Sequence, residues 1–139
     1  MKRIAVLIVV LAWGCTTKPE NKQDEKPLEF VSEVLAPEDF KLKSESTPEA
    51  ILLDVRTQEE MTEGYIEGAV NIDFRQPDFE SEIAKLDKEA TYLVYCAGGI
   101  RSGKAVQLMR DLQFKKVYDL EGGFTGWQAQ GLPSIKDQP

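Results

Sequence analysis

The stretch TYLVYCAGGIRSGKAVQLMRDL, residues 91–112, decides the fold. It begins with the β-branched and aromatic residues of a buried strand, passes through a cysteine and two glycines, and continues with the apolar spacing of a helix. A strand that meets a helix through a glycine-rich turn directs several backbone N–H groups, and the positive end of the helix dipole, towards one point. The pattern therefore predicts a binding place for an anion or a thiolate at Cys96.

Short apolar runs alternate with helical patterns on both sides of this stretch, which is typical of an α/β fold with a largely parallel sheet. The run AILLDVR suits a central strand buried on both faces, and Thr57 and Glu60 have the spacing of a capping box for a short helix that ends at Gly64. Expected strands cover 30–34, 50–56, 68–73, 91–96 and 115–121, and expected helices cover 36–46, 57–64, 78–87, 103–112 and 122–133. The stretches DVR, CAGGIR and LEGGFTGW each follow a strand, so we expect them to meet at one edge of the sheet.

The first residues are typical of an export signal. MKR supplies positive charge, IAVLIVVLAW supplies an apolar segment too short to span a bilayer, and Gly14 is a small residue before Cys15. This layout resembles the lipobox of bacterial lipoproteins, which implies a signal peptide over 1–14 and a lipidated Cys15; plain secretion is the alternative. We expect a flexible polar tether over 15–27, one domain over 28–133 and a C-terminal tail over 134–139. The expected location is the cell envelope, facing the periplasm or in the outer membrane.

Composition limits the classes of function. The chain has 139 residues, 42% of them hydrophobic, which allows one compact domain. Its formal net charge is −7, and loss of Lys2 and Arg3 with the signal makes it more negative by two, which argues against nucleic acid as a partner. The chain has no histidine, so Cys-His dyads, Ser-His-Asp triads and histidine-based metal sites are excluded. If Cys15 is lipidated, Cys96 is the only thiol and no intramolecular disulfide can form.

The segment CAGGIR suits a nucleophilic cysteine that works without histidine. Gly98 and Gly99 allow backbone angles that other residues avoid, so the loop can turn its N–H groups inward while the next helix adds its dipole. Such surroundings lower the pKa of a cysteine from ~8.5 to somewhere in the range ~3.5 to 7.5. Arg101 is placed to hold the loop and to neutralise an anion with a planar fork that lysine lacks. The alternative is a buried structural cysteine at the end of a strand.

Three segments in register, LLDVRTQEEMTEGYIEGAVNI, YCAGGIRS and DLEGGFTGW, resemble a single rhodanese domain, a sulfurtransferase fold shared with a class of phosphatases. The resemblance covers about residues 28–133 and implies a three-layer α/β/α fold with a central sheet of about five strands. It implies that Cys96 takes a sulfane sulfur from an anionic donor such as thiosulfate, holds it as a persulfide, and passes it to cyanide or a thiol. It implies no cofactor and no metal, and a protein acceptor stays open.

The resemblance also assigns roles to single residues. Cys96 is the nucleophile and persulfide carrier, and Arg101 stabilises the loop and the anion. The family's D-x-R motif makes Asp54 and Arg56 stabilisers of the rim, with Arg56 expected to pair with Glu60. Arg75 is a candidate second cation at the substrate mouth, with an ordinary solvated arginine as the open alternative. The substrate-binding loop comprises Ala97, Gly98, Gly99, Ile100 and Ser102.

Three other functions remain to be weighed. A non-enzymatic sulfur carrier or partner-docking module in the cell envelope has the same motifs. Phosphatase or arsenate reductase chemistry is disfavoured because four residues separate Cys96 from Arg101, whereas those related enzymes have five and so a wider cradle. The segment GGIRSGK fits a nucleotide-binding P-loop, but Ala105 stands where that loop needs serine or threonine for Mg²⁺.

Overall fold

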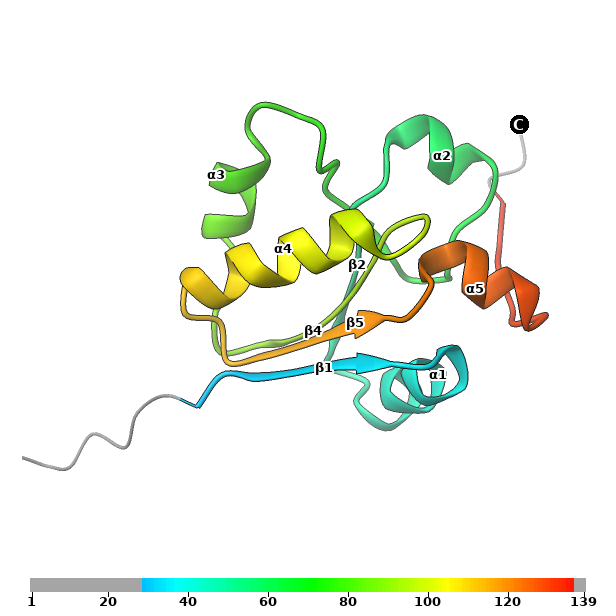
Figure 1. The fold of residues 1–139 in the computed structure, drawn as a ribbon, viewed down its shortest axis with the longest axis horizontal. Coiled ribbons are helices and arrows are strands. Elements are labelled where there is room, and N and C mark those ends of the chain that lie inside the picture. The colour runs from blue at the N-terminus through cyan, green and yellow to red at the C-terminus, as the bar shows by residue number, and fades with distance from the viewer. Residues whose placement is uncertain (1–28, 137–139) are drawn as a thin grey trace, which may run out of the picture.

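Five strands form one sheet in which every pairing is parallel, in the order β1-β5-β4-β2-β3. The computed structural model describes residues 29–136, and its fold is shown in Figure 1. The proposed signal peptide, Cys15, the tether and the last three residues of the tail lie outside the described residues. The elements in chain order are β1 (Val31–Leu35), α1 (Pro37–Ser46), β2 (Ile51–Asp54), α2 (Gln58–Thr62), β3 (Val70–Asn71), α3 (Phe79–Ala84), β4 (Thr91–Tyr95), α4 (Ile100–Asp111), β5 (Lys116–Leu120) and α5 (Gly123–Ala129).

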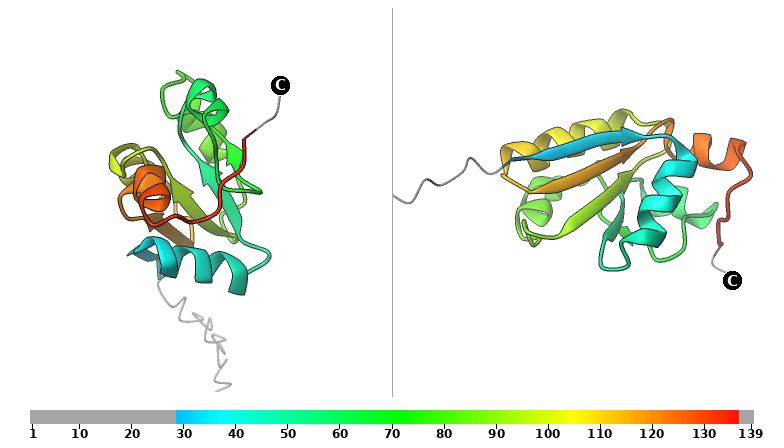
Figure 2. Two further views of the ribbon diagram at one scale, coloured as in Figure 1. Left: turned by 90° about the vertical axis from the view of Figure 1, so that its right-hand side faces the viewer. Right: turned by 90° about the horizontal axis from the view of Figure 1, so that it is seen from below.

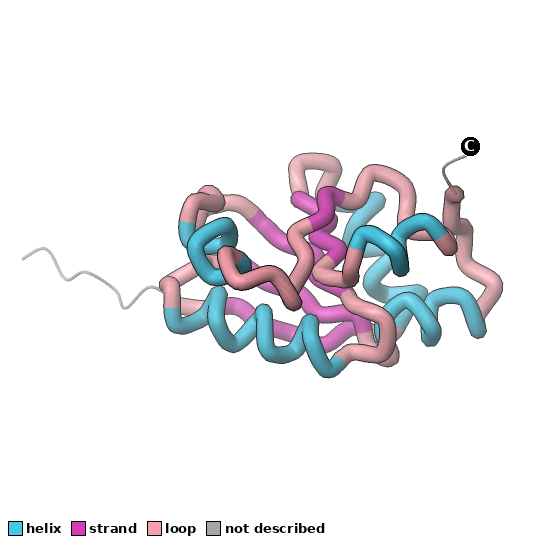
Figure 3. Tube along the Cα trace, turned by 90° about the horizontal axis from the view of Figure 1, so that it is seen from above, coloured by secondary structure: helices cyan, strands magenta, loops and turns pink. Residues whose placement is uncertain are grey.

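Helices cover both faces of the sheet, so the expected α/β/α layering is confirmed (Figures 1 and 2). The crossover from β1 to β2 runs across the sheet in one direction, whereas the crossovers from β3 to β4 and from β4 to β5 run in the other. Because parallel crossovers are right-handed, opposite directions place their helices on opposite faces. Helix α1 therefore lies on one face, while α3 and α4 lie on the other, where Figure 3 shows them in front of the strands.

Two apolar cores follow from this layering, one on each face of the sheet. The core under α3 and α4 contains Leu53, Val94, Ile83 and Met109, all fully buried. The core on the α1 side contains Phe40, Leu93, Phe124 and Trp127, so the two aromatic residues of the last short helix are core residues. Alternate residues of β2 and β4 point into different cores, which explains why both strands read as unbroken apolar runs.

The element boundaries differ from the sequence expectation most at β3, which has two residues instead of six, and at α5, which ends at Ala129 instead of residue 133. Helix α4 differs at its start. This helix begins at Ile100, three residues before the expected start, and Gly99 is its N-cap with φ of 100°. Arg101 and Ser102 therefore belong to the first helical turn and have fixed directions. The helical spacing of apolar residues begins only at Ala105, which explains the difference. In the described part of the chain, no helix has the length and apolar character needed to cross a bilayer.

Candidate active site

The segments that follow β2, β4 and β5 lie together at the carboxyl edge of the sheet (Figure 1). After β2 the chain continues outward to β3, whereas after β4 it turns back to β5, so the connections of these neighbouring strands diverge. Such a divergence leaves a crevice at the strand ends, where parallel sheets usually bind ligands. The loop of residues 96–99, which carries Cys96, starts at this point.

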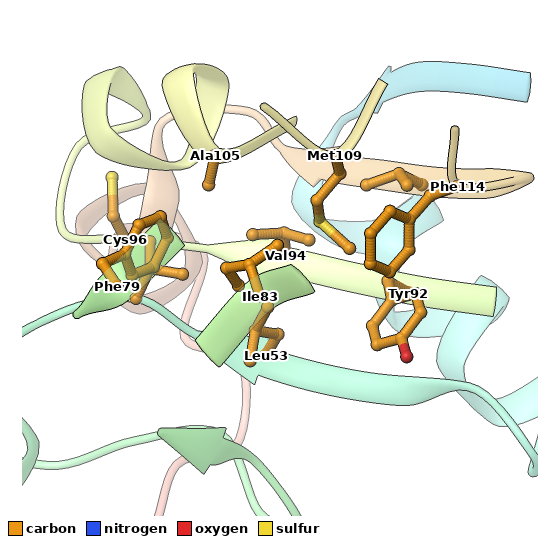
Figure 4. Close-up of a cluster of buried hydrophobic side chains, with 11 residues drawn as sticks. Leu53, Phe79, Ile83, Tyr92, Val94, Cys96, Ala105, Met109 and Phe114 are labelled. Atoms are coloured by element: carbon orange, nitrogen blue, oxygen red, sulfur yellow. The ribbon is translucent and has the colours of Figure 1, made fainter. Parts of the chain in front are cut away.

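The loop after β4 turns its backbone towards the sulfur of Cys96. The N–H of Gly99 donates to Cys96 Sγ over 3.1 Å, as expected from the sequence. Burial raises the pKa of Cys96, but hydrogen bonds from the Ser102 hydroxyl and from the amides of Ser102, Gly99 and Gly98 outweigh it, so the pKa lies below the usual value. Figure 4 shows the sulfur pointing away from the apolar side chains and towards the start of α4. This arrangement favours an anionic sulfur at position 96.

The start of α5 holds the cysteine loop in place through backbone hydrogen bonds. The N–H groups of Phe124 and Thr125 donate to the carbonyl oxygens of Cys96 and Ala97, over 2.8 and 2.9 Å. These contacts require Gly123, because a Cβ there would lie 2.5 Å from the Cys96 oxygen and 2.6 Å from the Ala97 oxygen. With both carbonyl oxygens bound to α5, the loop presents N–H groups to the sulfur. Gly123 thus supports the loop.

Arg101 is held by a two-pronged ion pair with Glu60. Its Nη1 and Nη2 donate to Glu60 Oε2 and Oε1 over 2.7 and 2.6 Å, across 41 positions of sequence. The Glu60 carboxylate also accepts from the N–H of Thr57, and the Glu60 N–H bonds the Thr57 hydroxyl, which completes the expected capping box. The hydrogen bonds to Glu60 are the main cause that raises the pKa of Arg101, and the charge of Cys96 contributes, so the guanidinium also lies within electrostatic reach of the sulfur. Glu60 thereby fixes a cation beside the loop.

Replacement of Glu60 by glutamine is expected to lower the free energy of unfolding by about 1–2 kcal/mol at pH 7. The hydrogen bonds from Arg101 are the main cause that lowers the pKa of Glu60 to about 2, against burial, which raises it. A carboxylate with a lowered folded-state pKa stabilises the fold above its unfolded-state pKa, near 4.5, and loses this effect as the pH falls through about 2. Urea unfolding between pH 2 and pH 7 measures the difference.

The matched control is Glu59→Gln, on the exposed side of the same helix, which is expected to change stability by less than about 0.5 kcal/mol. The role given to the ion pair would be contradicted if both variants lost the same free energy of unfolding. It would also be contradicted if the loss in Glu60→Gln stayed constant down to pH 2.

Arg56 pairs with Asp54, so the expected pairing of Arg56 with Glu60 was wrong. The Nη2 of Arg56 lies 2.6 Å from Asp54 Oδ2, and both side chains are buried, at 3% and 0% exposed. Arg56 also donates to the carbonyl oxygens of Glu60 and Gly64 and lies over the ring of Phe124, 4.2 Å from its centroid. The Glu60 carboxylate is engaged by Arg101, which the local spacing between positions 56 and 60 could not reveal. The rim role expected for Asp54 and Arg56 fits these contacts.

Arg75 lies in the exposed segment between β3 and α3, where its backbone N–H donates to Asp73 Oδ1. The charge of Asp73 contributes to the raised pKa of Arg101, so this segment comes near the site. Within the described part of the chain no hydrogen bond or ion pair joins Arg75 to Cys96, and its place at the substrate mouth stays a prediction. Within residues 29–136, no three acidic or cysteine side chains are grouped closely enough to bind a metal ion.

Asp119, near the end of β5, is a buried carboxyl that the sequence reasoning did not assign. It is 7% exposed, and its Oδ1 has no hydrogen-bond partner in the described structure. Burial is the main cause that raises the pKa of Asp119 to about 6, against the Ser102 hydroxyl and the Leu120 amide, which lower it. The available signal was an acidic residue inside KVYDL, a strand otherwise apolar enough to be buried on both faces.

Asp119→Asn is expected to stabilise the fold at pH 8 by about 1–3 kcal/mol. A carboxyl with a raised folded-state pKa favours folding below its unfolded-state pKa, near 3.8, and this contribution disappears as the pH rises through about 6. The gain in free energy of unfolding of Asp119→Asn over the unchanged chain should therefore grow from near zero at pH 4 to its full value above pH 6. Urea unfolding at several pH values between 4 and 8 measures it. The exposed Glu121 provides the control Glu121→Gln, and a gain independent of pH would contradict the burial argument.

Comparisons with known proteins agree with the fold and identify a family. The family model for the rhodanese-like domain matches residues 36–130. The putative sulfurtransferase YtwF of Bacillus subtilis is 37% identical over 94 residues, which are 68% of this chain and 88% of that protein. The thiosulfate sulfurtransferase GlpE of Coxiella burnetii is 39% identical over 79 residues, 57% of this chain and 72% of that protein.

Longer proteins and solved structures match as well. The tRNA uridine(34) hydroxylase of Acaryochloris marina is 32% identical over 108 residues, and this match spans only 34% of the length of that hydroxylase. The crystal structure of a rhodanese-related protein from Thermoplasma volcanium superposes with a TM-score of 0.66 at 28% identity, covering 76% of this chain and 99% of that one.

Proposed function

Because the chain belongs to the rhodanese-like domain family, we propose that it is a sulfurtransferase that carries sulfane sulfur on Cys96. The observation that carries the proposal is the hydrogen bond of 3.1 Å from the Gly99 N–H to the sulfur, together with the lowered pKa of that thiol. The names of the relatives YtwF and GlpE support the same class of chemistry. A small anionic donor such as thiosulfate and a thiol or cyanide acceptor are the proposed substrates.

In the first half-reaction, the Cys96 thiolate attacks the outer sulfur of thiosulfate. A new S–S bond forms, the S–S bond of the donor breaks, and its electron pair leaves with sulfite. The N–H groups that stabilise the thiolate also stabilise the persulfide anion, Cys96-S-S⁻, that results. Arg101 contributes its positive charge without moving, because Glu60 fixes both of its Nη atoms.

In the second half-reaction, the acceptor anion attacks the terminal sulfur of the persulfide. The S–S bond breaks, its electron pair returns to Cys96, and the product leaves as thiocyanate or as the persulfide of the acceptor thiol. Cys96 is then the leaving group, and a lowered pKa makes a thiolate leave more readily. Storage of the sulfur on Cys96 divides one difficult transfer into two easier steps.

One observation favours the carrier as a second candidate function. Cys96 is only 1% exposed, so the loop and its neighbours cover the sulfur as well as polarise it. A covered thiol would react slowly with small molecules until a partner protein opened the loop. This candidate predicts little turnover with cyanide alone and a recovery of the rate when a partner is added.

The proposed location is the cell envelope. The sequence pattern of residues 1–14 and Cys15 supports an exported lipoprotein, and these residues lie outside the described part of the chain. A lipid on Cys15 would hold the domain near a membrane through the polar residues that follow.

Initial rates with thiosulfate and cyanide, each varied at several fixed concentrations of the other, test the proposed function. Transfer through a persulfide predicts parallel lines in double-reciprocal plots, because sulfite leaves before cyanide reacts. Intersecting lines would indicate that both substrates bind together and would contradict the covalent route. Release of phosphate from an aryl phosphate that depends on Cys96 would instead support phosphatase chemistry.

A further inference from the structure

Ile100, the first residue of α4, is an apolar side chain that the fold leaves in water. It is 76% exposed, more than any other large hydrophobic side chain among the described residues, where Val34 follows with 63%. Single exposed apolar side chains are common on protein surfaces and need no explanation by themselves. Ile100 differs from the others in its position, because it directly follows the loop that carries Cys96.

The geometry of that loop brings Ile100 close to the sulfur. Its chain neighbour Gly99 donates an N–H to Cys96 Sγ over 3.1 Å. Consecutive Cα atoms are about 3.8 Å apart, so the Cα of Ile100 lies within about 9 Å of that sulfur. In Figure 4 the sulfur points towards the start of α4, where Ile100 is the first helical residue. An organic group that brings its own sulfur to Cys96 therefore comes within reach of Ile100.

The side chains around Ile100 offer such a group little free charge. The three residues between Cys96 and Ile100 are uncharged, and Arg101 has both of its Nη atoms bound by Glu60. The first turn of α4 contains no acidic residue, whereas the first turns of α1, α2 and α3 each contain two. An exposed isoleucine is thus the main uncompensated feature of the loop and the helix start.

A second apolar side chain lies at the same core cluster. Cys96 and Phe79 belong to one buried cluster, and Phe74 packs against that cluster from the segment that leads to α3. The ring of Phe74 lies 4.9 Å from the ring of Phe79 and is only partly buried. An exposed aliphatic group and a partly exposed aromatic ring both suit contact with a carbon chain or a ring.

We infer that Ile100 is a specificity-determining residue that selects acceptor thiols with an apolar carbon body. The inference rests on the proposed function for the identity of the reaction. The acceptor thiolate attacks the terminal sulfur of Cys96-S-S⁻, the S–S bond breaks, its electron pair stays on Cys96, and the acceptor leaves as its persulfide anion. During this step the body of the acceptor packs on Ile100, and the apolar surface removed from water favours the transfer.

The test compares two acceptor thiols that react with the same charge, benzyl mercaptan and 1-thioglycerol, on the full chain with thiosulfate as donor. Sulfite release gives kcat/KM for each acceptor, expressed per thiolate. The unchanged chain is expected to favour benzyl mercaptan, and Ile100→Ser is expected to lower the ratio of the two values by about 10-fold. Both thiols react with the same persulfide, so a general effect on the loop cancels in the ratio. Ile100→Leu, which stays apolar, is expected to retain most of the preference.

Leu42→Ser provides the matched control. Leu42 is 58% exposed on α1, which lies on the opposite face of the sheet from α4. This variant is expected to leave the ratio unchanged. The inference would be overturned by an unchanged ratio in Ile100→Ser, by an equal fall in Leu42→Ser, or by an unchanged chain that prefers 1-thioglycerol.

A small thiol and a cysteine of a partner protein both present this chemistry, and blocked tripeptides distinguish the two sources. A cysteine between two leucines is compared with a cysteine between two serines in the same assay. An effect of Ile100→Ser that is confined to the small thiols assigns a small acceptor, and a larger effect on the peptides assigns a protein cysteine. No effect on either pair would overturn the inference.

Alkylation of the reduced protein separates this inference from the proposed function, because it uses no sulfur donor. The rates of adduct formation at Cys96 with N-benzyliodoacetamide and with iodoacetamide are measured by mass spectrometry of the peptide that contains Cys96. Their ratio is expected to fall in Ile100→Ser as the ratio for the thiols does. A chain that shows this selectivity without sulfur transfer would refute only the proposed function. A chain that transfers sulfur with equal ratios in both proteins would refute only the role of Ile100.

Discussion

Cys96→Ser is expected to reduce thiosulfate-dependent formation of thiocyanate by at least ~10³-fold, to the rate without protein. A serine hydroxyl can accept the hydrogen bond from Gly99, but it is not ionised near neutral pH and cannot hold sulfur as a persulfide. The fold should be preserved, because the substitution replaces one small buried side chain by another. Colorimetric detection of thiocyanate measures the rate, and thermal unfolding checks the fold.

The chain offers a matched control for this change. It has two cysteines, and Cys15→Ser makes the same substitution at the other one. This variant of the full chain is expected to keep the rate of sulfur transfer, whatever it does to membrane attachment. Activity that survives Cys96→Ser but is lost in Cys15→Ser would show that Cys15 carries the sulfur, and it would refute the proposed mechanism.

Gly123→Ala is expected to lower the free energy of unfolding by more than about 3 kcal/mol or to prevent folding. The residue has φ of +58°, and a Cβ would lie 2.5 to 2.7 Å from backbone atoms of Cys96 and Ala97. Those atoms cannot move without breaking the hydrogen bonds from the Phe124 and Thr125 N–H groups. Any folded fraction should have a raised Cys96 pKa, because the loop must shift away from α5.

Gly131→Ala separates the effect of contact from the effect of backbone conformation. Gly131 has a similar φ of +67°, but nothing lies within 4 Å of a Cβ built there. Its substitution should lower the free energy of unfolding by only about 1–2 kcal/mol, which is the cost of a left-handed backbone at a residue other than glycine. Urea unfolding of both variants gives the comparison. Equal losses would mean that the close approach of α5 to the cysteine loop does not support the site.

Local patterns predicted the architecture well. The apolar runs around Leu53 and Val94 located the central strands, and the spacing of Thr57 and Glu60 located a capping box that the structure contains. These signals lie within a few residues of one another, so the sequence carries them directly. The glycine-rich turn after Cys96 likewise indicated inward N–H groups, and the contact from Gly99 has the expected direction.

The partners of the charged residues were harder to predict, because they depend on segments far apart in the sequence. Glu60 lies four residues after Arg56, a spacing that suggests a local pair, yet its carboxylate binds Arg101. Arg56 instead forms an ion pair with Asp54, which lies two residues before it at the end of β2. The position of Asp119 inside an apolar strand indicated burial, but its neighbour Ser102 depends on the packing of α4 against β5, which the local pattern does not carry.

The most direct test of the account is the intact mass of the protein before and after incubation with thiosulfate. A loop that stabilises an anionic sulfur predicts a mass gain of one sulfur atom in the wild-type chain, none in Cys96→Ser, and loss of the added sulfur on treatment with cyanide. A folded wild-type protein that reacts with iodoacetamide at Cys96 but gains no sulfur would contradict the proposed sulfur transfer.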